Sequence, residues 1–216
     1  MGDTSGEPGA RQHEIVQERA QRTRAHILDV AARAFAQGGY AGTALNDVIR
    51  ASGLTKGAFY FHFPSKDALA LATFRMKQEE LITRLQKEAG EQPTALRQLA
   101  ALLRLRAQLF SQDPSLRCVL RLGAELGAHA EPGSAYAAFQ ETALALLTAV
   151  LVRGQEEGSI RSELPPRATA ETIFAAIFGL DELSQMLAAR TDLAARTEAL
   201  LAVLLPGLAA GVSTHG

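Results

Sequence analysis

Two polar side chains, Lys56 and Tyr60, lie four residues apart and therefore share one stripe of any helix that contains both. A lysine near a helix start can reach guanine acceptors or a phosphate, and a tyrosine can stack on a thymine methyl group or bond a phosphate. Phe59 and Phe63, also four apart, form a second stripe that can face a protein core. The spacing predicts a short helix with one buried face and one DNA-contacting face.

Four neighbouring residues extend this predicted surface. Thr55 stands where a hydroxyl both caps the helix and contacts backbone oxygens. Gly57 costs about 1 kcal/mol relative to alanine inside a helix, which favours close backbone approach to DNA, with local packing as the alternative. His62 has no partner ligands at helical spacing, so we expect a phosphate contact and no metal site. Lys66 opposes the dipole of the next helix, which favours a shared phosphate site; a solvated lysine is the alternative.

The DNA-contacting helix is predicted to be the second of a pair. Thr43 is expected to cap the first helix, and Gly53 lets the chain turn in a left-handed conformation. Pro64 bars continuation of the second helix, and Ser65 caps a third. Two helices joined by a glycine-containing turn form a helix-turn-helix, whose second helix enters the major groove of DNA.

Helix-forming residues with apolar spacings of three and four dominate the whole chain, and no strand is predicted. Glycines and prolines mark the breaks between helices, as at Gly38-Gly39 and Pro165-Pro166. We therefore expect an all-α, two-lobed fold. Its nine helices are expected over about residues 18–37, 44–52, 55–61, 65–89, 94–112, 115–128, 135–157, 167–189 and 192–209.

Three regions follow from this order. Residues 1–17 are expected to be a disordered tail, since the Gly-, Pro- and Ser-containing start has no apolar run and is no signal peptide. Residues 18–66 are the predicted helix-turn-helix DNA-binding domain. Residues 67–216 are the predicted ligand-binding and dimerisation domain, and the fourth helix joins the two.

Charge is distributed unevenly along the chain. Residues 11–78 hold ten Lys and Arg against five Asp and Glu, whereas residues 79–216 hold twelve against sixteen. A basic segment joined to an acidic remainder fits a nucleic-acid module attached to another domain. Such an excess alone is often only a solvated face, but here it coincides with the predicted helix-turn-helix.

Composition excludes several classes of protein. A hydrophobic fraction of 47% is ample for a packed core and argues against bulk disorder. The one cysteine, Cys118, excludes a disulfide framework and a cysteine-rich metal site. No segment approaches the ~18 apolar residues needed to span a bilayer. We therefore expect a cytoplasmic protein with no membrane partner.

A resemblance to a known family rests on three segments, TALNDVI at 43–49, SGLTKGAFYFHF at 52–63 and SKDAL at 65–69. Together they closely resemble the DNA-binding domain of TetR-type repressors, over about residues 18–75. The resemblance implies an all-helical homodimer whose C-terminal lobe binds a small inducer. By motif position, it implies DNA contacts at Thr43, Thr55, Lys56, Gly57, Tyr60, His62 and Lys66.

A second resemblance reaches the C-terminal lobe. The segments VLRLGAE at 119–125, FGLDELS at 178–184, ARTDL at 189–193 and LPG at 205–207 look like the γ-butyrolactone receptor branch, actinomycete regulators of antibiotic production and differentiation. That branch usually places a tryptophan in the ligand pocket, whereas this chain has none and Phe139 falls nearest the position. A related but different small molecule is therefore an alternative to a butyrolactone.

Two apolar sets are assigned to the C-terminal lobe. Aromatic side chains that could line a ligand pocket are Phe110, Phe139, Phe174 and Phe178, with plain core packing as the alternative. The last two helices carry apolar faces too extensive for a monomer's surface, which predicts a twofold dimer through helices 8 and 9. These faces comprise Ile173, Ile177, Leu180, Leu187, Leu193, Leu200 and Leu204.

The sequence thus predicts a ligand-responsive repressor that binds near-palindromic double-stranded operator DNA as a homodimer and is released by a small hydrophobic inducer. The alternative is a non-inducible architectural DNA-binding protein, which needs no sizeable effector cavity. The chain shows no glycine-rich phosphate loop, metal-ligand spacing or nucleophile motif. We therefore expect no enzyme activity, no catalytic residue, no cofactor and no metal.

Overall fold

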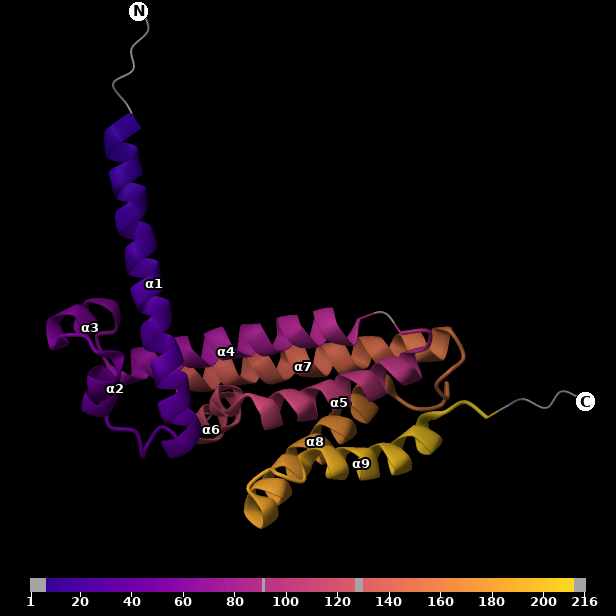
Figure 1. Cartoon of the computed structure of the whole chain (residues 1–216). Helices are drawn as coiled ribbons and strands as arrows, with labels where there is room; N and C mark the ends of the chain where they lie inside the picture. The colour runs from indigo at the N-terminus through magenta and orange to yellow at the C-terminus, as the bar shows by residue number, and fades with distance from the viewer. Residues whose placement is uncertain (1–6, 91, 127–129, 212–216) are drawn as a thin grey trace, which may run out of the picture.

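The computed structural model describes residues 7–90, 92–126 and 130–211, and within these ranges the regular elements are all helical (Figure 1). This confirms the predicted all-α fold class and its nine α-helices. The helices are α1 (Glu7–Gly38), α2 (Leu45–Ser52), α3 (Lys56–His62), α4 (Lys66–Ala89), α5 (Ala95–Gln112), the 3₁₀ helix η1 (Pro114–Leu116), α6 (Arg117–Leu126), α7 (Ala130–Glu156), α8 (Pro166–Ala188) and α9 (Leu193–Leu208).

The N-terminal helix is longer than expected. Helix α1 begins at Glu7, so the prediction of a disordered tail to residue 17 is wrong for residues 7–17; residues 1–6 lie outside the described residues. The glycines and prolines of the first ten residues had suggested a tail, but Gln, Glu, Arg and Ala then continue without a break and favour a helix. An ion pair between Glu18 and Arg22, one turn apart, supports it. The first turns of α1 project away from the rest of the chain (Figure 1).

Helices α2 and α3 form the predicted helix-turn-helix. Gly53 ends α2 in the left-handed region, with a φ of 70°. The Thr55 hydroxyl accepts a hydrogen bond from the Ala58 N–H at 3.3 Å, and the Ser65 hydroxyl accepts one from the Ala68 N–H at 3.0 Å. These contacts confirm the predicted turn at Gly53 and the predicted caps of α3 and α4.

The predicted cap of α2 is wrong. Ala44, not Thr43, occupies the capping position, and it makes no side-chain capping bond. The Thr43 side chain turns inward, and its hydroxyl donates to the Gly39 carbonyl at 2.7 Å. The hydroxyl therefore satisfies an orphan carbonyl at the end of α1, where burial makes a hydrogen bond more valuable than at the exposed start of α2.

Two element boundaries in the C-terminal lobe also differ from expectation. Pro114 starts η1, whose cap is Asp113, so α6 begins two residues later than expected, at Arg117. The expected break at residues 131–133 is absent, because α7 already begins at Ala130 and includes Pro132 in its first turn. Proline is tolerated there since the first N–H groups of a helix have no intrahelical partner.

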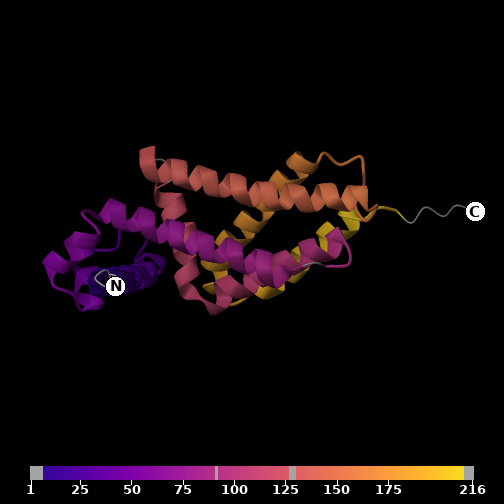
Figure 2. The same ribbon diagram turned by 90° about the horizontal axis from the view of Figure 1, so that it is seen from above.

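Helix α4 joins the helix-turn-helix to the C-terminal lobe. It starts at the end of α3 and runs the length of the lobe, beside α7 (Figure 2). It packs against α1, α5, α6 and α7, so it contacts both the helix that precedes the helix-turn-helix and helices of the C-terminal lobe. Because α4 is one continuous helix, a displacement of its C-terminal part within the lobe also moves its first turn, which lies beside α3.

One described helix meets the length and composition of a membrane span, contrary to the expectation that no segment would. It is the stretch Ala135–Glu156 of α7, with a mean hydropathy of 1.5. This helix packs against α4, α5, α6 and α8. Of this stretch, 22% is buried inside the chain, and one such helix is only weak evidence for a membrane span.

Candidate DNA-binding helix and ligand pocket

Helix α3 has the two predicted faces. Phe59 and Phe63 are buried, at 0% and 2% exposure, in the core of the helix-turn-helix. Lys56, Gly57 and Tyr60 lie on the exposed side. A Cβ atom added at Gly57 would meet no atom within 4 Å, so local packing does not require this glycine. This observation favours the predicted close approach of DNA over packing as the reason for the glycine.

Thr55 and His62 flank this surface. Thr55 is exposed while its hydroxyl caps α3, and His62 is half-buried with its ring 5.2 Å from the ring of Phe61. Within the described ranges, no group of three or more His, Cys, Asp and Glu residues could hold a metal ion. Both side chains lie on or beside α3, so their DNA contacts stay a prediction.

Lys66 is held in place at the start of α4. Its Nζ lies 4.3 Å from the centre of the Tyr40 ring, a cation–π contact, and the Tyr40 hydroxyl donates to the Asp67 carboxylate. Burial, together with the hydrogen bond and charge of Asp67, raises the pKa of Tyr40 to about 12, so the donor stays protonated. These contacts favour an oriented cation at the helix N-terminus over a freely solvated lysine.

The structure separates Thr43 from the other predicted DNA contacts, and it shows a further exposed side chain on α3. Thr43 is 6% exposed with its hydroxyl bonded inward, so its side chain does not share the exposed surface of the other predicted contacts. Phe61 is 82% exposed on α3, and sequence reasoning missed it. It follows Gly57 by four residues, so the spacing argument that paired Lys56 with Tyr60 would also have found it.

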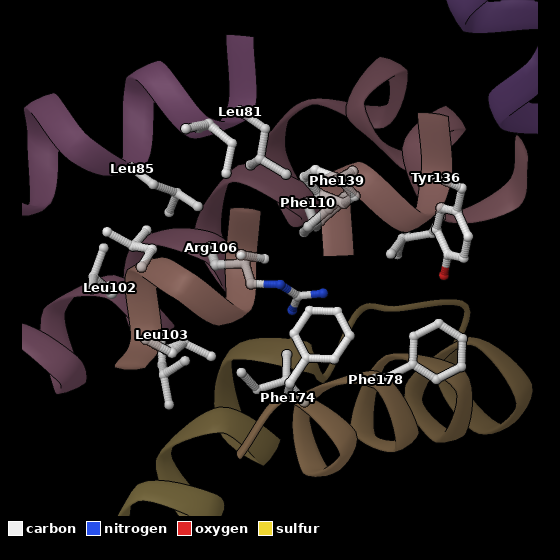
Figure 3. A pocket seen from close by; sticks show the side chains of 16 residues that line it. Leu81, Leu85, Leu102, Leu103, Arg106, Phe110, Tyr136, Phe139, Phe174 and Phe178 are labelled. Carbon is white, nitrogen blue, oxygen red and sulfur yellow. The ribbon is translucent and has the colours of Figure 1, made fainter. Parts of the chain in front are cut away.

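The C-terminal lobe contains an apolar pocket between α4, α5, α6, α7 and α8 (Figure 3). It holds about 80 Å³ of space that the centre of a water molecule can reach. All four predicted aromatic residues line it, so the structure brings Phe110, Phe139, Phe174 and Phe178 together. The other lining residues are Leu81, Ile82, Leu85, Leu102, Leu103, Arg106, Leu120, Tyr136, Ala143, Leu146, Leu147 and Ile177.

Arg106 is the charged residue of the pocket lining, and sequence reasoning missed it. Its guanidinium reaches in beside Phe174 (Figure 3) and lies 4.7 Å from the centre of the Phe110 ring. An Nη2 N–H donates to the carboxylate of Asp181, which is fully buried. The signal was the spacing of Leu102, Arg106 and Phe110, which puts the arginine on the apolar stripe of α5.

Several polar contacts join the lobe to α1. The Arg121 Nη1 on α6 donates to the Gln37 carbonyl at 2.7 Å. Lys77 on α4, whose side chain is 8% exposed, lies 2.8 Å from Glu80 and 3.6 Å from Asp29 of α1. Burial alone would lower the pKa of Lys77, but the hydrogen bond and charge of Glu80, with the charge of Asp29, raise it overall. A charged lysine therefore bridges α4 and α1.

The apolar faces predicted for dimerisation are only partly free. Ile173 and Leu193 are buried within the chain at 1% exposure each, because α8 and α9 pack on the rest of the lobe. The strongly exposed apolar residues of these helices are a different set, of which only Leu187 was predicted. They are Leu183, Met186, Leu187 and Val203.

The chain is similar to known bacterial regulatory proteins. Residues 27–73 match the family described as bacterial regulatory proteins, tetR family. The chain is 29% identical to the A-factor receptor protein of Streptomyces griseus over 206 residues, covering 92% of this chain and 68% of that protein.

Two solved structures are also similar. TylP, a TetR regulator from Streptomyces fradiae, is 32% identical with a TM-score of 0.69, over 88% of each chain. A structure described as the molecular basis for control of antibiotic production by bacterial hormones is 33% identical with a TM-score of 0.76, over 88% of this chain and 98% of that one.

Proposed function

The chain belongs to the TetR family of bacterial regulatory proteins, and we propose that it is a dimeric repressor that a small apolar signal molecule releases from its operator. TetR-family members are transcriptional regulators that bind DNA. Double-stranded operator DNA of near-palindromic sequence is the proposed target, with Thr55, Lys56, Gly57, Tyr60, His62 and Lys66 as the proposed contacts. The proposed domains meet along α4, and the proposed location is the cytoplasm.

One observation carries the proposal: α4 is shared by both candidate sites. Its first turn holds Ser65 and Lys66 beside α3, and three of its later residues, Leu81, Ile82 and Leu85, line the pocket. A rigid helix transmits a displacement at the pocket to the opposite end. Ligand binding releases DNA only if the ligand binds the DNA-incompetent arrangement more tightly than the competent one.

The pocket also places α4 against a candidate ligand site. Water-sized molecules have room inside it, and α4 forms one of its walls. A ligand that displaces this wall would therefore move α4. The pocket also disfavours a non-inducible architectural protein, which has no use for an internal apolar site.

The ligand class is proposed from the lining and the relatives together. Apolar and aromatic side chains dominate the pocket, which suits a molecule with a hydrocarbon portion. The similarity to the A-factor receptor protein favours a γ-butyrolactone-like signal. The chain has no tryptophan, and Phe139 lies in the lining, so a related but different small molecule is the alternative.

Dimerisation is proposed through α8 and α9. Met186 and Leu187 are 77% and 66% exposed on α8, and Val203 is 78% exposed on α9. Large apolar side chains exposed on two helices that pack together are unfavourable in water and favour a partner surface. A twofold contact would present two α3 helices to successive major grooves, about 34–36 Å or a multiple of one DNA turn apart.

The proposal is tested by selecting DNA from a random duplex pool with the full chain and sequencing the bound fraction. We expect a near-palindrome with two half-sites, bound by protein dimers. Recovery of DNA with no shared sequence, or binding that saturates at one protomer per operator, would contradict it.

A further inference from the structure

The pocket holds one strong polar group in an otherwise apolar enclosure. Arg106 and the Tyr136 hydroxyl are the polar features among lining residues that are otherwise hydrocarbon or aromatic. A guanidinium in such a place has lost much of its hydration, so its remaining N–H groups need acceptors. Neither the apolar lining nor the ring of Phe110 beneath the guanidinium supplies an acceptor of full strength.

Asp181 satisfies only part of this need. Within the described residues, Arg106 makes a single hydrogen bond to this carboxylate, through Nη2, although arginine–carboxylate pairs are frequently bidentate. The second Asp181 oxygen, Oδ1, is buried without a hydrogen-bond partner in the described part of the chain. The Arg106 side chain keeps 18% exposure beside the cavity that it lines. An acceptor entering the pocket can therefore reach guanidinium donors that Asp181 leaves free.

Charge around this pair is unbalanced toward the cation. Asp181 also faces Arg190, which is 4% exposed and whose Nε is buried without a partner among the described residues. The charges of Arg117 and Arg121 also act on Arg190, and within the described residues the guanidinium groups of both donate to backbone carbonyls. Against these arginines stand Asp181 and the exposed Glu182. A negative charge added at Arg106 would reduce this excess.

We infer that the effector is an amphiphilic carboxylate, and that Arg106 binds its carboxylate while the aromatic lining covers its hydrocarbon portion. This assignment rests on the proposed function and narrows its ligand class. A carboxylate can accept two charge-assisted hydrogen bonds from one guanidinium, whereas a lactone carbonyl is a neutral acceptor. Asp181 then acts as a positioning residue that holds Arg106 toward the pocket.

The test compares three ten-carbon probes, decanoate, γ-decalactone and 1-decanol, by isothermal titration into the full chain at pH 8, where the carboxylate is ionised. We expect decanoate to bind at least about tenfold more tightly than either neutral probe, as a charge-assisted pair in an apolar site is about twice as strong as a neutral hydrogen bond. Equal affinities for decanoate and γ-decalactone would overturn the inference, and so would the absence of binding by all three probes.

Two variants test whether the preference for decanoate depends on the Arg106–Asp181 pair. The double variant Arg106→Met/Asp181→Leu removes both charges together and leaves no unpaired ion, so the ratio of decanoate to lactone affinity should fall to about one. Asp181→Asn keeps the cation and removes the competing charge, so the same ratio should rise. A ratio that either variant leaves at the wild-type value would contradict the role of Arg106.

A matched control and a second readout separate this inference from the proposed function. Arg104→Met removes an arginine two residues away whose partner, Glu198, lies outside the pocket, and it should leave the ratio unchanged. Operator affinity is measured with each probe at saturation. If decanoate binds preferentially but leaves operator affinity unchanged, the proposed function is contradicted and the carboxylate preference is not. If the lactone releases operator and decanoate does not, the carboxylate preference is contradicted and the proposed function is not.

Discussion

The Glu125 carboxylate on α6 accepts a hydrogen bond from the backbone N–H of Ala41 at 2.8 Å, so the C-terminal lobe holds the turn between α1 and α2 directly. Gly39 makes this approach possible, because its φ is 67° and a Cβ there would lie 1.8 Å from the Glu125 carboxylate. Leu120, on the same helix, lines the pocket. Helix α6 therefore offers a second mechanical connection between pocket and helix-turn-helix, beside α4.

Removing this contact should weaken the release of operator by ligand more than it weakens the affinity for the ligand. Glu125→Ala deletes an exposed hydrogen bond, so the coupling between pocket and operator should fall by about 1 kcal/mol, roughly fivefold in the induction ratio. Fluorescence anisotropy of labelled operator, with and without saturating ligand, measures that ratio. Glu156→Ala, at an exposed carboxylate at the end of α7, is the matched control. An induction ratio equal to wild type would exclude α6 from the coupling.

Two lysines should affect DNA binding in different ways. Lys56→Ala removes an exposed side chain from the predicted base-reading stripe and should cost about 1–3 kcal/mol of specific binding. Lys66→Ala should weaken binding evenly across sequences and reduce the slope of log affinity against log salt by about one. Gel-shift titrations on operator and scrambled duplexes, at several salt concentrations, distinguish the two. Wild-type binding by both variants would show that α3 does not dock as proposed.

Charge placed on the exposed faces of α8 and α9 should separate the dimer. Met186→Glu with Leu187→Glu puts two carboxylates where apolar side chains are proposed to meet their partner copies, and like charges would face each other across a twofold axis. Light scattering at micromolar concentration should show a monomeric mass for the variant and a dimeric mass for wild type. Ile15→Glu, at an exposed apolar residue on α1, controls for added charge. A variant that stays dimeric places the interface elsewhere.

Asp113 should contribute stability that depends on pH. Burial raises its pKa, but hydrogen bonds from the Ser115 hydroxyl at 2.6 Å and backbone N–H at 2.9 Å, with the charge of Lys77, lower it overall. A carboxylate with a lowered folded-state pKa stabilises the fold above its unfolded pKa of about 3.9, and this contribution disappears as pH falls through the folded-state value.

Asp113→Ala should therefore cost about 1 kcal/mol at pH 7, the value of a helix cap, and clearly less below the folded-state pKa. Urea unfolding at pH 7 and in a series of acidic buffers gives the two free energies of unfolding. A cost that stays constant, or grows, as the pH falls would show that the charge of Asp113 contributes nothing.

Local signals in the sequence predicted most of the fold. Gly53, Thr55 and Ser65 each have a conformational or capping preference that neighbouring residues do not oppose, so the end of α2 and the starts of α3 and α4 followed from residue type alone. Thr94 likewise caps α5, accepting from the Arg97 N–H at 3.3 Å. The buried and exposed faces of α3 followed from helical spacing.

The remaining features depend on tertiary packing. The Thr43 hydroxyl could accept from an N–H group at the start of α2 or donate to a carbonyl at the end of α1, and only the packed structure decides between these two roles. Arg104 and Arg106 are two residues apart on one amphipathic helix, yet one pairs with Glu198 at the surface and the other lines the pocket. Composition does not distinguish them, because the choice depends on which helices pack against each face of α5.

The central claim is that a molecule in this pocket controls DNA binding, and paired operator titrations of wild type and Phe139→Trp test it most directly. Each protein is titrated with labelled operator alone, with saturating decanoate and, separately, with saturating γ-decalactone. Phe139 lies in the pocket lining, so the larger ring should change the response to these ligands while ligand-free operator affinity stays within about twofold of wild type. We predict release of operator from wild type and an altered ligand preference in the variant. Operator release that is identical in both proteins, or none in wild type despite a filled pocket, would contradict the account.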